Sequence, residues 1–281
     1  TRTQQGDLLS CAYASHGDTK QILLFPSTAK ECFEFAANAF DISDRLQTPV
    51  IVMSDLELGM NEQVCDQLVW DDKRIYDKGK VLTAKELDEI DKFGRYQDVD
   101  SDGIPYRTYP GTHPNKGSYF TRGSSHDGNA AYTEDGDVYA EVMDRIALKF
   151  ESALNYIPQP EISDIDKSRL GMIFLGTTTS AIQEVLDSLA KKGISIDTLR
   201  IKSFPFHKNI KEFIDSHALV YVIEQNRDAQ LKSLLKIELN ANEEQLHSIL
   251  SYNGILITAQ HIEREILESM PTLEATKDVP A

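Results

Sequence analysis

The stretch QILLFPSTAKECFEFAANAFDISDRLQTPVIVMSD, residues 21–55, constrains the fold more than any other part of this chain. It predicts a buried strand over residues 21–25 and a second buried strand over residues 50–54. Between them it predicts a helix that starts with a capping box of Thr28 and Glu31. Apolar residues recur at helical spacing along this helix: Phe33, Ala36, Ala37, Phe40 and Leu46.

A strand–helix–strand unit of this length requires a parallel sheet that is covered on both faces. Sheets of this kind bind ligands beyond the carboxyl ends of their strands. Here one end is marked by Pro26 and Ser27 and the other by Ser54 and Asp55. We therefore expect a ligand crevice where these two ends meet.

A second α/β unit follows a long insertion. Residues 58–132 are irregular, with one predicted helix over residues 83–92, as is typical of a binding loop or an interface arm. A helix then carries apolar residues four apart, and the polar stretch 155–168 is typical of a linker. The spaced apolar residues are Val138, Val142, Ile146, Phe150 and Leu154. We expect an α/β fold with two doubly wound domains, residues 1–157 and 168–275.

The second domain has its own strand and helix signals. The stretch RLGMIFLGTTTSAIQEVLDSLAKKG predicts a buried strand, a turn at Gly176 and a helix that starts with a Ser180 and Gln183 capping box. Gly193 supplies the left-handed residue after that helix. SIDTLRIKSFPF and ALVYVIEQN predict further strands, and AQHIEREILESM predicts a last helix, so at least three parallel strands are expected.

Composition excludes several classes of function. The 281 residues carry a net charge of −16, from 29 basic and 45 acidic residues, which argues against nucleic acid as the main partner. No apolar run approaches the roughly 20 residues of a membrane span, and no secretion signal is seen at the start. The three cysteines form no close pair, so we expect no metal cluster in this chain and a reducing cytoplasm. They are Cys11, Cys32 and Cys65.

Two polar motifs each allow two interpretations. DVDSDG, residues 98–103, matches the first half of a calcium loop, but Pro105 and Tyr109 break the pattern, and a solvated acidic turn is the alternative. LGTTTS, residues 175–180, resembles a phosphate-binding turn at a helix start but lacks the Lys and the glycine spacing of a P-loop. Plain helix capping is the favoured interpretation.

Histidines provide the remaining site candidates. His126 and Asp127 lie in the Gly- and Ser-rich loop TRGSSHDGN, which suits either a functional loop or a surface turn. His16 either terminates a helix or lines the ligand crevice. Four others are scattered without metal-binding spacing, so no metal site and no complete catalytic set is predicted: His207, His217, His247 and His261.

Four longer stretches, in this order, resemble the alpha subunit of the 2-oxoacid:ferredoxin oxidoreductases. They are TRTQQGDLLSCAYASHGD, AANAFDISDRLQTPVIVMSD, DSDGIPYRTYPGTHPNKGSYFTRGSSHDGNAAYTED and LVYVIEQNRDAQLKSLL. Together they span most of residues 1–270, and they are most similar to the 2-oxoglutarate type. The resemblance implies a C-terminal fragment that holds the back half of a thiamine-pyrimidine domain and a transketolase C-terminal-like domain.

The resemblance also implies cofactors and partners. Thiamine diphosphate with Mg²⁺ would be shared with a beta subunit, which would carry the diphosphate motif and a [4Fe–4S] cluster. Thr1 matches a Thr beside the 2-oxoacid, and His16, His126 and Asp127 would lie near the cofactor crevice or the subunit interface. Ferredoxin, the 2-oxoacid and CoA are the other implied partners.

The implied reaction converts 2-oxoglutarate, CoA and oxidised ferredoxin to succinyl-CoA, CO₂ and reduced ferredoxin in the cytoplasm. The isolated fragment is expected to be inactive. One alternative keeps the family and changes the substrate to pyruvate or another 2-oxoacid. An alternative of a different class is a non-catalytic assembly module that holds the beta subunit.

Overall fold

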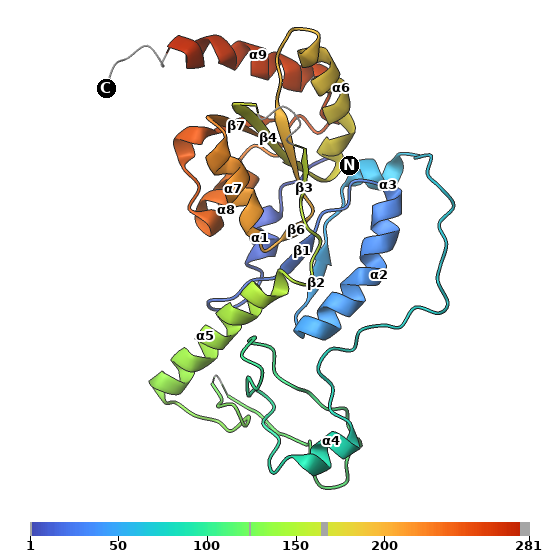
Figure 1. Cartoon of the computed structure of the whole chain (residues 1–281), viewed down its shortest axis with the longest axis vertical. Helices are drawn as coiled ribbons and strands as arrows, with labels where there is room; N and C mark the ends of the chain where they lie inside the picture. Colours follow the sequence, from blue (N-terminus) through green and yellow to red (C-terminus); the bar gives the residue numbers. More distant parts are fainter. Residues whose placement is uncertain (1, 124, 164–167, 276–281) are drawn as a thin grey trace.

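The computed structural model of the chain describes residues 2–123, 125–163 and 168–275 and has two sheets (Figure 1). A three-stranded sheet has the order β2-β1-β6, and a five-stranded sheet has the order β3-β5-β4-β7-β8. The α/β class is therefore confirmed. The elements are α1 (Leu8–Ala12), β1 (Ile22–Leu24), α2 (Ala29–Leu46), β2 (Val50–Val52), α3 (Leu56–Met60), α4 (Ala84–Glu89), α5 (Gly136–Ala153), β3 (Glu161–Ser163), β4 (Leu170–Leu175), η1 (Gly176–Thr178), α6 (Thr179–Ala190), β5 (Asp197–Ile201), β6 (Ser203–Phe204), α7 (Lys208–Ser216), β7 (Leu219–Glu224), α8 (Gln230–Leu239), η2 (Glu243–Gln245), β8 (Leu246–Leu250) and α9 (Ala259–Ala275).

The five-stranded sheet is doubly wound. Its strands β5, β4, β7 and β8 are parallel, and β3 pairs antiparallel with β5 at one edge. Side chains alternate along β4, so that Met172 and Phe174 pack with α6 and α9 while Ile173 and Leu175 pack with α7 and α8. Figure 1 shows α6 and α9 together on one side of this sheet. Strand β3 falls in the stretch expected to be a linker, so that expectation was wrong for residues 161–163.

The expected strand–helix–strand unit is present, and β1 joins it to the second sheet. Strands β1 and β2 pair in parallel, and β6, which follows β5 along the chain, adds to the other edge of β1 in the antiparallel sense. Ile22 and Leu24 face α2 and α5, whereas Leu23 and Phe25 enter the core that α7 and α8 share with the five-stranded sheet. The two sheets therefore have one continuous core between them.

Two expectations about this unit need correction. Strand β2 was expected to be buried, but it is an edge strand of the three-stranded sheet and Val52 is 36% exposed. Phe40 was expected on the core face of α2, but it is 71% exposed, and the core side of the helix is formed by Phe35, Ile42 and Leu46. The cause is that α2 is apolar on two sides, so helical spacing alone did not identify the buried one.

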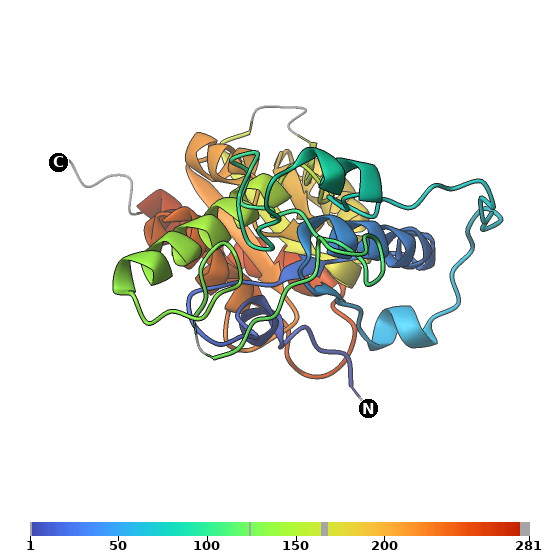
Figure 2. The same ribbon diagram turned by 90° about the horizontal axis from the view of Figure 1, so that it is seen from below.

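The insertion runs outside α2 and returns beneath it (Figures 1 and 2). The ring of Trp70 packs edge-on against Phe33, with 5.9 Å between centroids, which covers part of the second apolar side of α2. Helix α4 starts at a complete capping box of Thr83 and Glu86, within the helix expected over residues 83–92. Among the described residues, no helix is both long enough and apolar enough to cross a membrane.

The acidic DVDSDG motif is a turn in which Lys80 pairs with two of the three aspartates. The Lys80 ammonium lies 2.7 Å from a carboxylate oxygen of Asp100 and 2.7 Å from one of Asp102. Asp98 accepts hydrogen bonds from the backbone N–H groups of Asp102 and Gly103. These contacts between Lys80 and the acidic loop are in keeping with the acidic-turn interpretation.

Candidate functional site

A small crevice lies where β1, β2 and β4 end. It encloses about 40 Å³, and its lining includes the expected strand-end residues Pro26, Ser54 and Asp55. Leu175 and Gly176, at the end of β4 in the five-stranded sheet, form a second part of its lining. Residues 4–8, before and at the start of α1, form the rest. The crevice therefore combines strand ends of both sheets, where the sequence predicted only those of the first.

The segment before α1 is fixed in place by the residues that follow β7. The Gln5 backbone N–H donates to the Gln225 carbonyl at 2.9 Å, and the Asn226 side chain donates to the Gln5 carbonyl at 3.2 Å. Gln230 at the start of α8 adds a bond to the Gly6 carbonyl at 2.5 Å. The segment thus lies across the gap between the ends of β4 and β7, where the strand order of a doubly wound sheet reverses and ligands bind.

Asp55 and Thr177 are the centre of the polar network inside this gap. The Thr177 hydroxyl donates to Asp55 Oδ2, and it accepts from Gln5 Nε2 at 3.3 Å and from Gln225 Nε2 at 3.1 Å. Gln5 Nε2 also lies 3.2 Å from Asp55 Oδ2. These contacts link the end of β2, the end of β4 and the end of β7 through one hydroxyl group.

Two buried carboxylates flank this network. Burial and the neighbouring Asp55 charge raise the pKa of Glu57, whose carboxylate accepts from Ser180 at 3.3 Å. Burial also raises the pKa of Glu224, although Asn226 and the backbone N–H groups of Leu231 and Lys232 donate to it. Glu224 thus holds the turn after β7 against the start of α8. Ser180 bonds to Glu57 and to the Thr177 carbonyl instead of forming the capping box expected with Gln183.

Replacing Thr177 with Val is expected to destabilise the chain by about 1–3 kcal/mol, because it removes a donor to Asp55 without changing the side-chain shape much. Denaturant unfolding would measure the loss. Thr179→Val is the matched control, since the Thr179 hydroxyl bonds only to the Gly176 carbonyl of its own turn in the contacts found. Equal stability of the two variants would contradict the central role of Thr177.

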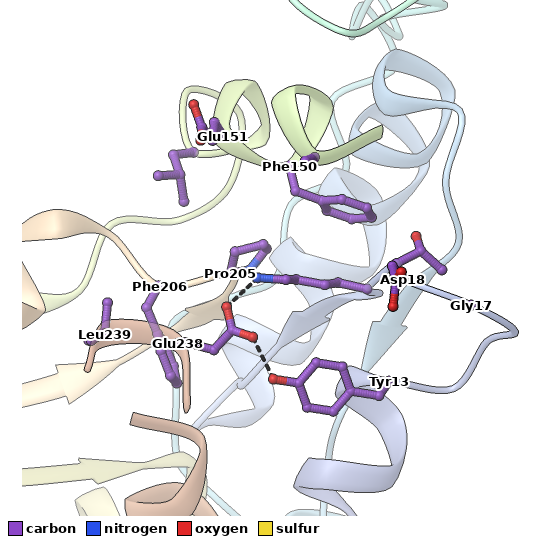
Figure 3. Close-up of a pocket in the computed structure, with 13 residues that line it drawn as sticks. Tyr13, Gly17, Asp18, Phe150, Glu151, Pro205, Phe206, Glu238 and Leu239 are labelled. Atoms are coloured by element: carbon purple, nitrogen blue, oxygen red, sulfur yellow. Dashed lines mark hydrogen bonds and ion pairs between the residues drawn. The ribbon is translucent and has the colours of Figure 1, made fainter. Parts of the chain in front are cut away.

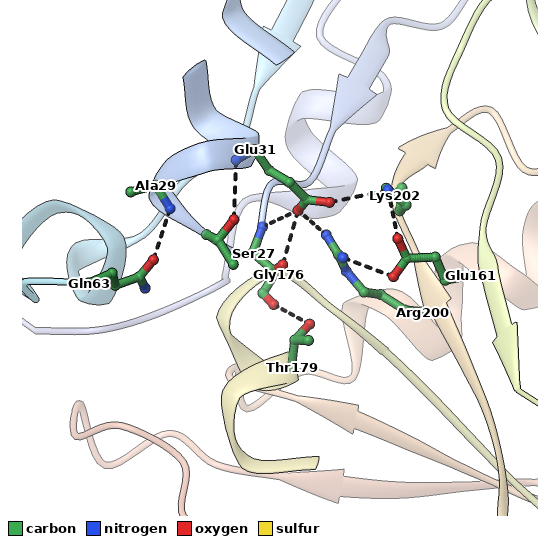
Figure 4. Close-up of polar contacts among 10 residues, drawn as sticks. Ser27, Ala29, Glu31, Gln63, Glu161, Gly176, Thr179, Arg200 and Lys202 are labelled. Carbon is green, nitrogen blue, oxygen red and sulfur yellow. Dashed lines mark hydrogen bonds and ion pairs between the residues drawn. The ribbon is translucent and has the colours of Figure 1, made fainter. Parts of the chain in front are cut away.

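The end of β1 is clamped by Glu31 (Figure 4). The Thr28 hydroxyl accepts from the Glu31 N–H at 3.1 Å, as in the expected capping box. The Glu31 carboxylate, however, accepts from the N–H and hydroxyl of Ser27 and pairs with Arg200 of β5 and with Lys202, which directly follows β5. Burial alone would raise the pKa of Glu31, but the bonds from Arg200, Ser27 and Lys202 outweigh it and lower the pKa to about 2.

A larger cavity of about 510 Å³ lies between α1, α5 and α8 (Figure 3). Glu238 forms its polar wall: it accepts from the Tyr13 hydroxyl at 2.5 Å and pairs with the Lys20 ammonium. Phe150 and Phe206 form apolar walls. Because the carboxylate is already neutralised by Lys20, the polar wall offers little free hydrogen-bonding capacity to a ligand.

The predicted site residues His16, His126 and Asp127 are not among the residues that line this crevice. Thr1 is outside the described residues. His16 is exposed on the turn after α1, next to Gly17 and Asp18, which line the larger cavity. His126 stacks on Tyr96 with 3.9 Å between ring centroids, and Asp127 accepts from the N–H groups of Asn129 and Ala131. Those bonds, first the one from Ala131, lower the pKa of Asp127.

Gln5, Thr177 and Gln225 were not predicted from the sequence as parts of one site. Each carries a weak local signal: Gln225 directly follows an apolar strand, and Thr177 lies in LGTTTS, which was assigned to phosphate binding or capping. What brings them together is the pairing of β4 with β7 and the path of the chain before α1. That information is tertiary.

The fold and crevice define the chain as an α/β protein with a crevice at the ends of parallel strands. Residues 1–92 match the family model described as pyruvate flavodoxin/ferredoxin oxidoreductase, thiamine diP-binding. The chain is 26% identical over 261 residues to the 2-oxoacid:ferredoxin oxidoreductase subunit alpha of Saccharolobus solfataricus, covering 90% of this chain and 40% of that subunit. It is therefore similar to the alpha subunits of 2-oxoacid:ferredoxin oxidoreductases, as the four sequence stretches predicted.

Two further comparisons agree. The 2-oxoglutarate synthase subunit KorA of Methanocaldococcus jannaschii is 23% identical over 277 residues, covering 95% of this chain and 69% of the subunit. The structure of 2-oxoglutarate:ferredoxin oxidoreductase from Magnetococcus marinus superposes with a TM-score of 0.76 at 20% sequence identity. The superposition covers 96% of this chain and 46% of the Magnetococcus chain, so the two share a fold. The chain spans about 40% of the length of the first relatives that it matches.

Proposed function

We propose that this chain is part of the alpha subunit of a thiamine diphosphate-dependent 2-oxoglutarate:ferredoxin oxidoreductase of the cytoplasm. The subunit would act with a beta subunit on 2-oxoglutarate, CoA and ferredoxin to give succinyl-CoA, CO₂ and reduced ferredoxin. The main support is a similarity that extends over 90–95% of the chain and includes subunits named 2-oxoglutarate synthase. The crevice adds to this support because most of its lining belongs to the matched residues 1–92.

The lining of the crevice, though not its volume of about 40 Å³, suits one part of thiamine diphosphate. Phe25, Pro26 and Met53 give it an apolar side and Gln4, Ser54 and Asp55 a polar side, which is the combination that a heteroaromatic aminopyrimidine needs. None of the described residues that line it is Lys or Arg, so it does not suit the diphosphate. In the proposal, the diphosphate and Mg²⁺ are held by the beta subunit, which also carries a [4Fe–4S] cluster.

The role of this chain is then binding and orientation. When bound, thiamine diphosphate supplies the carbanion chemistry of 2-oxoacid decarboxylation. The bonds from Gln225, Asn226 and Gln230 hold residues 5 and 6 beside the crevice. In the proposal Thr1 contacts the 2-oxoacid, and His16, His126 and Asp127, which do not line the crevice, face the beta subunit.

Viologen reduction would test the proposal. The intact alpha subunit that contains this chain would be purified anaerobically with its partner and supplied with CoA, thiamine diphosphate and either 2-oxoglutarate or pyruvate. We expect reduction with 2-oxoglutarate. A preference for pyruvate, the substrate in the name of the matched family model, would change the substrate and keep the family. No reduction with either, despite a bound partner that carries its cluster, would favour the assembly role.

The isolated 281-residue chain is expected to show no thiamine-dependent reduction under the same conditions. The physical reason is that none of the described residues lining its crevice is a Lys or Arg that could hold the diphosphate. The measurement is the same viologen assay without the beta subunit. Turnover by the chain alone would contradict the division of the site between two subunits.

A further inference from the structure

Three cations gather at the carboxyl end of α2 without an ion-pair partner. Arg145 and Lys149 lie one turn apart on α5, and Arg95 reaches them from the insertion. Among the described residues, none of the three is within ion-pair distance of a carboxylate, although the chain as a whole is strongly acidic. Burying cations without counter-charges is unfavourable, so this cluster needs an explanation.

Specific contacts fix the position of each cation. Lys149 Nζ donates to the Thr48 hydroxyl at 2.6 Å, and Arg95 Nη2 donates to the Gln47 side-chain oxygen at 2.6 Å. Arg145 Nη1 donates to the Gly103 carbonyl at 3.0 Å. All three acceptors are neutral, so no contact in the set compensates the charges.

Gly103 holds the loop of the insertion tightly against α5. Its φ is +76°, and a Cβ atom built on it would lie 2.3 Å from the Lys149 backbone nitrogen and 2.6 Å from the Arg145 carbonyl oxygen. Only glycine fits there without displacing backbone, so the loop and the helix are in direct contact. The cations are therefore brought together by close backbone packing and not by flexible side chains alone.

Several donors of the cluster have no acceptor. Arg95 Nε and Nη1 and Arg145 Nε are buried without a hydrogen-bond partner among the described residues. The rings of Tyr96 and Tyr119 lie 4.9 and 5.6 Å from the Arg95 guanidinium carbon and shield it from water. A buried donor that is left unpaired costs about 1–3 kcal/mol, and more when it is charged.

The nearby negative groups compensate only part of this charge. Asp98 acts on Arg145 through space and favours its charged form, but among the described residues it forms no ion pair with Arg145, and its oxygens accept from the backbone N–H groups of Asp102 and Gly103. The carboxyl end of α2 contributes about half a negative charge against three cations. Burial, with Arg145 and Arg95 nearby, lowers the pKa of Lys149 to about 8, so its ammonium remains mostly charged at pH 7.

We propose that Arg95, Arg145 and Lys149 form a binding site for one small anion, either a halide or a tetrahedral oxyanion. The ion would accept from the unpaired guanidinium N–H groups and from the Lys149 ammonium. It would link α5, the insertion and the carboxyl end of α2. This site is separate from the strand-end crevice and independent of the proposed function.

Chloride-35 NMR on the 281-residue chain would test the site. We expect saturable broadening of the chloride line by the wild-type chain at pH 7. Lys149→Met is expected to reduce this broadening at least fivefold, because it removes the ammonium and keeps most of the aliphatic stem. The Thr48 hydroxyl keeps its own bond to the Leu46 carbonyl in this variant. The matched control is Lys85→Met, an equal loss of charge at an exposed position of the same insertion.

Added sulfate distinguishes the two kinds of anion: displacement of chloride assigns the site to oxyanions as well, and failure to displace it assigns the site to halides. Broadening that is equal in the wild type and in folded Lys149→Met would overturn the proposal. So would the absence of saturable broadening in the wild type. If Lys149→Met does not fold, as judged by circular dichroism, Arg95→Gln replaces it with the same expected loss.

Discussion

Glu31→Gln is expected to lower the free energy of unfolding by about 3 kcal/mol at pH 7. The substitution keeps the shape of the side chain and removes the carboxylate that Arg200 and Lys202 share with Ser27. The Arg200 side chain is only 8% exposed, so water cannot fully replace its lost partner. Urea or guanidinium unfolding followed by circular dichroism would measure the change.

The control for this prediction is Glu161→Gln. Glu161 pairs with the same Arg200 and Lys202, but its side chain is 57% exposed, so its loss is expected to cost less than about 1 kcal/mol. Equal losses of unfolding free energy in the two variants would show that burial of the carboxylate does not determine how strongly it stabilises the chain through Arg200 and Lys202.

The Glu31 clamp should also depend on pH in one direction. Its pKa is about 2 in the folded chain and near 4.3 in an unfolded chain, so unfolding takes up protons between these values. Its stabilising effect is therefore complete above about pH 5 and is lost as the pH falls toward 2. The stability difference between the wild type and Glu31→Gln should shrink on acidification, and a difference that is constant from pH 7 to 3 would contradict the lowered pKa.

Leu23→Ala is expected to cost about 3 kcal/mol, because it opens a cavity in the core between the two sheets. Leu23 is fully buried and lies opposite Ile51 of β2 and Phe204 of β6. Because this core is continuous, we expect the variant to unfold in a single transition at lower denaturant concentration. Separate transitions for the two sheets would show that the shared core does not couple them.

Phe40→Ala is the comparison for the core prediction. The sequence pattern placed Phe40 in the core, whereas the structure places it on the surface with 71% exposure. Its removal is expected to cost less than about 1 kcal/mol despite the larger side chain. A cost as large as that of Leu23→Ala would favour the core position that the sequence pattern suggested.

Local patterns were reliable where one short segment decides the outcome. The first strand, the helix that begins after Thr28 and the parallel partner strand were all predicted from residues 21–55, because strand ends and helix caps depend on adjacent residues. Gly193 has φ +75°, as its place after a helix predicted. The same reasoning failed for Ser180, since the buried Glu57 carboxylate of α3, 123 residues away along the chain, competes for its hydroxyl.

The sequence by itself determined the α/β class, the position of the first crevice-forming strand ends and the resemblance to oxidoreductase alpha subunits. Only the tertiary structure decided which side of α2 is buried, that β2 lies at a sheet edge, and that Gln5, Thr177 and Gln225 meet at Asp55. The physical reason is distance along the chain. Caps and periodicity act over a few residues, whereas Thr177 lies 122 residues from the carboxylate to which it donates.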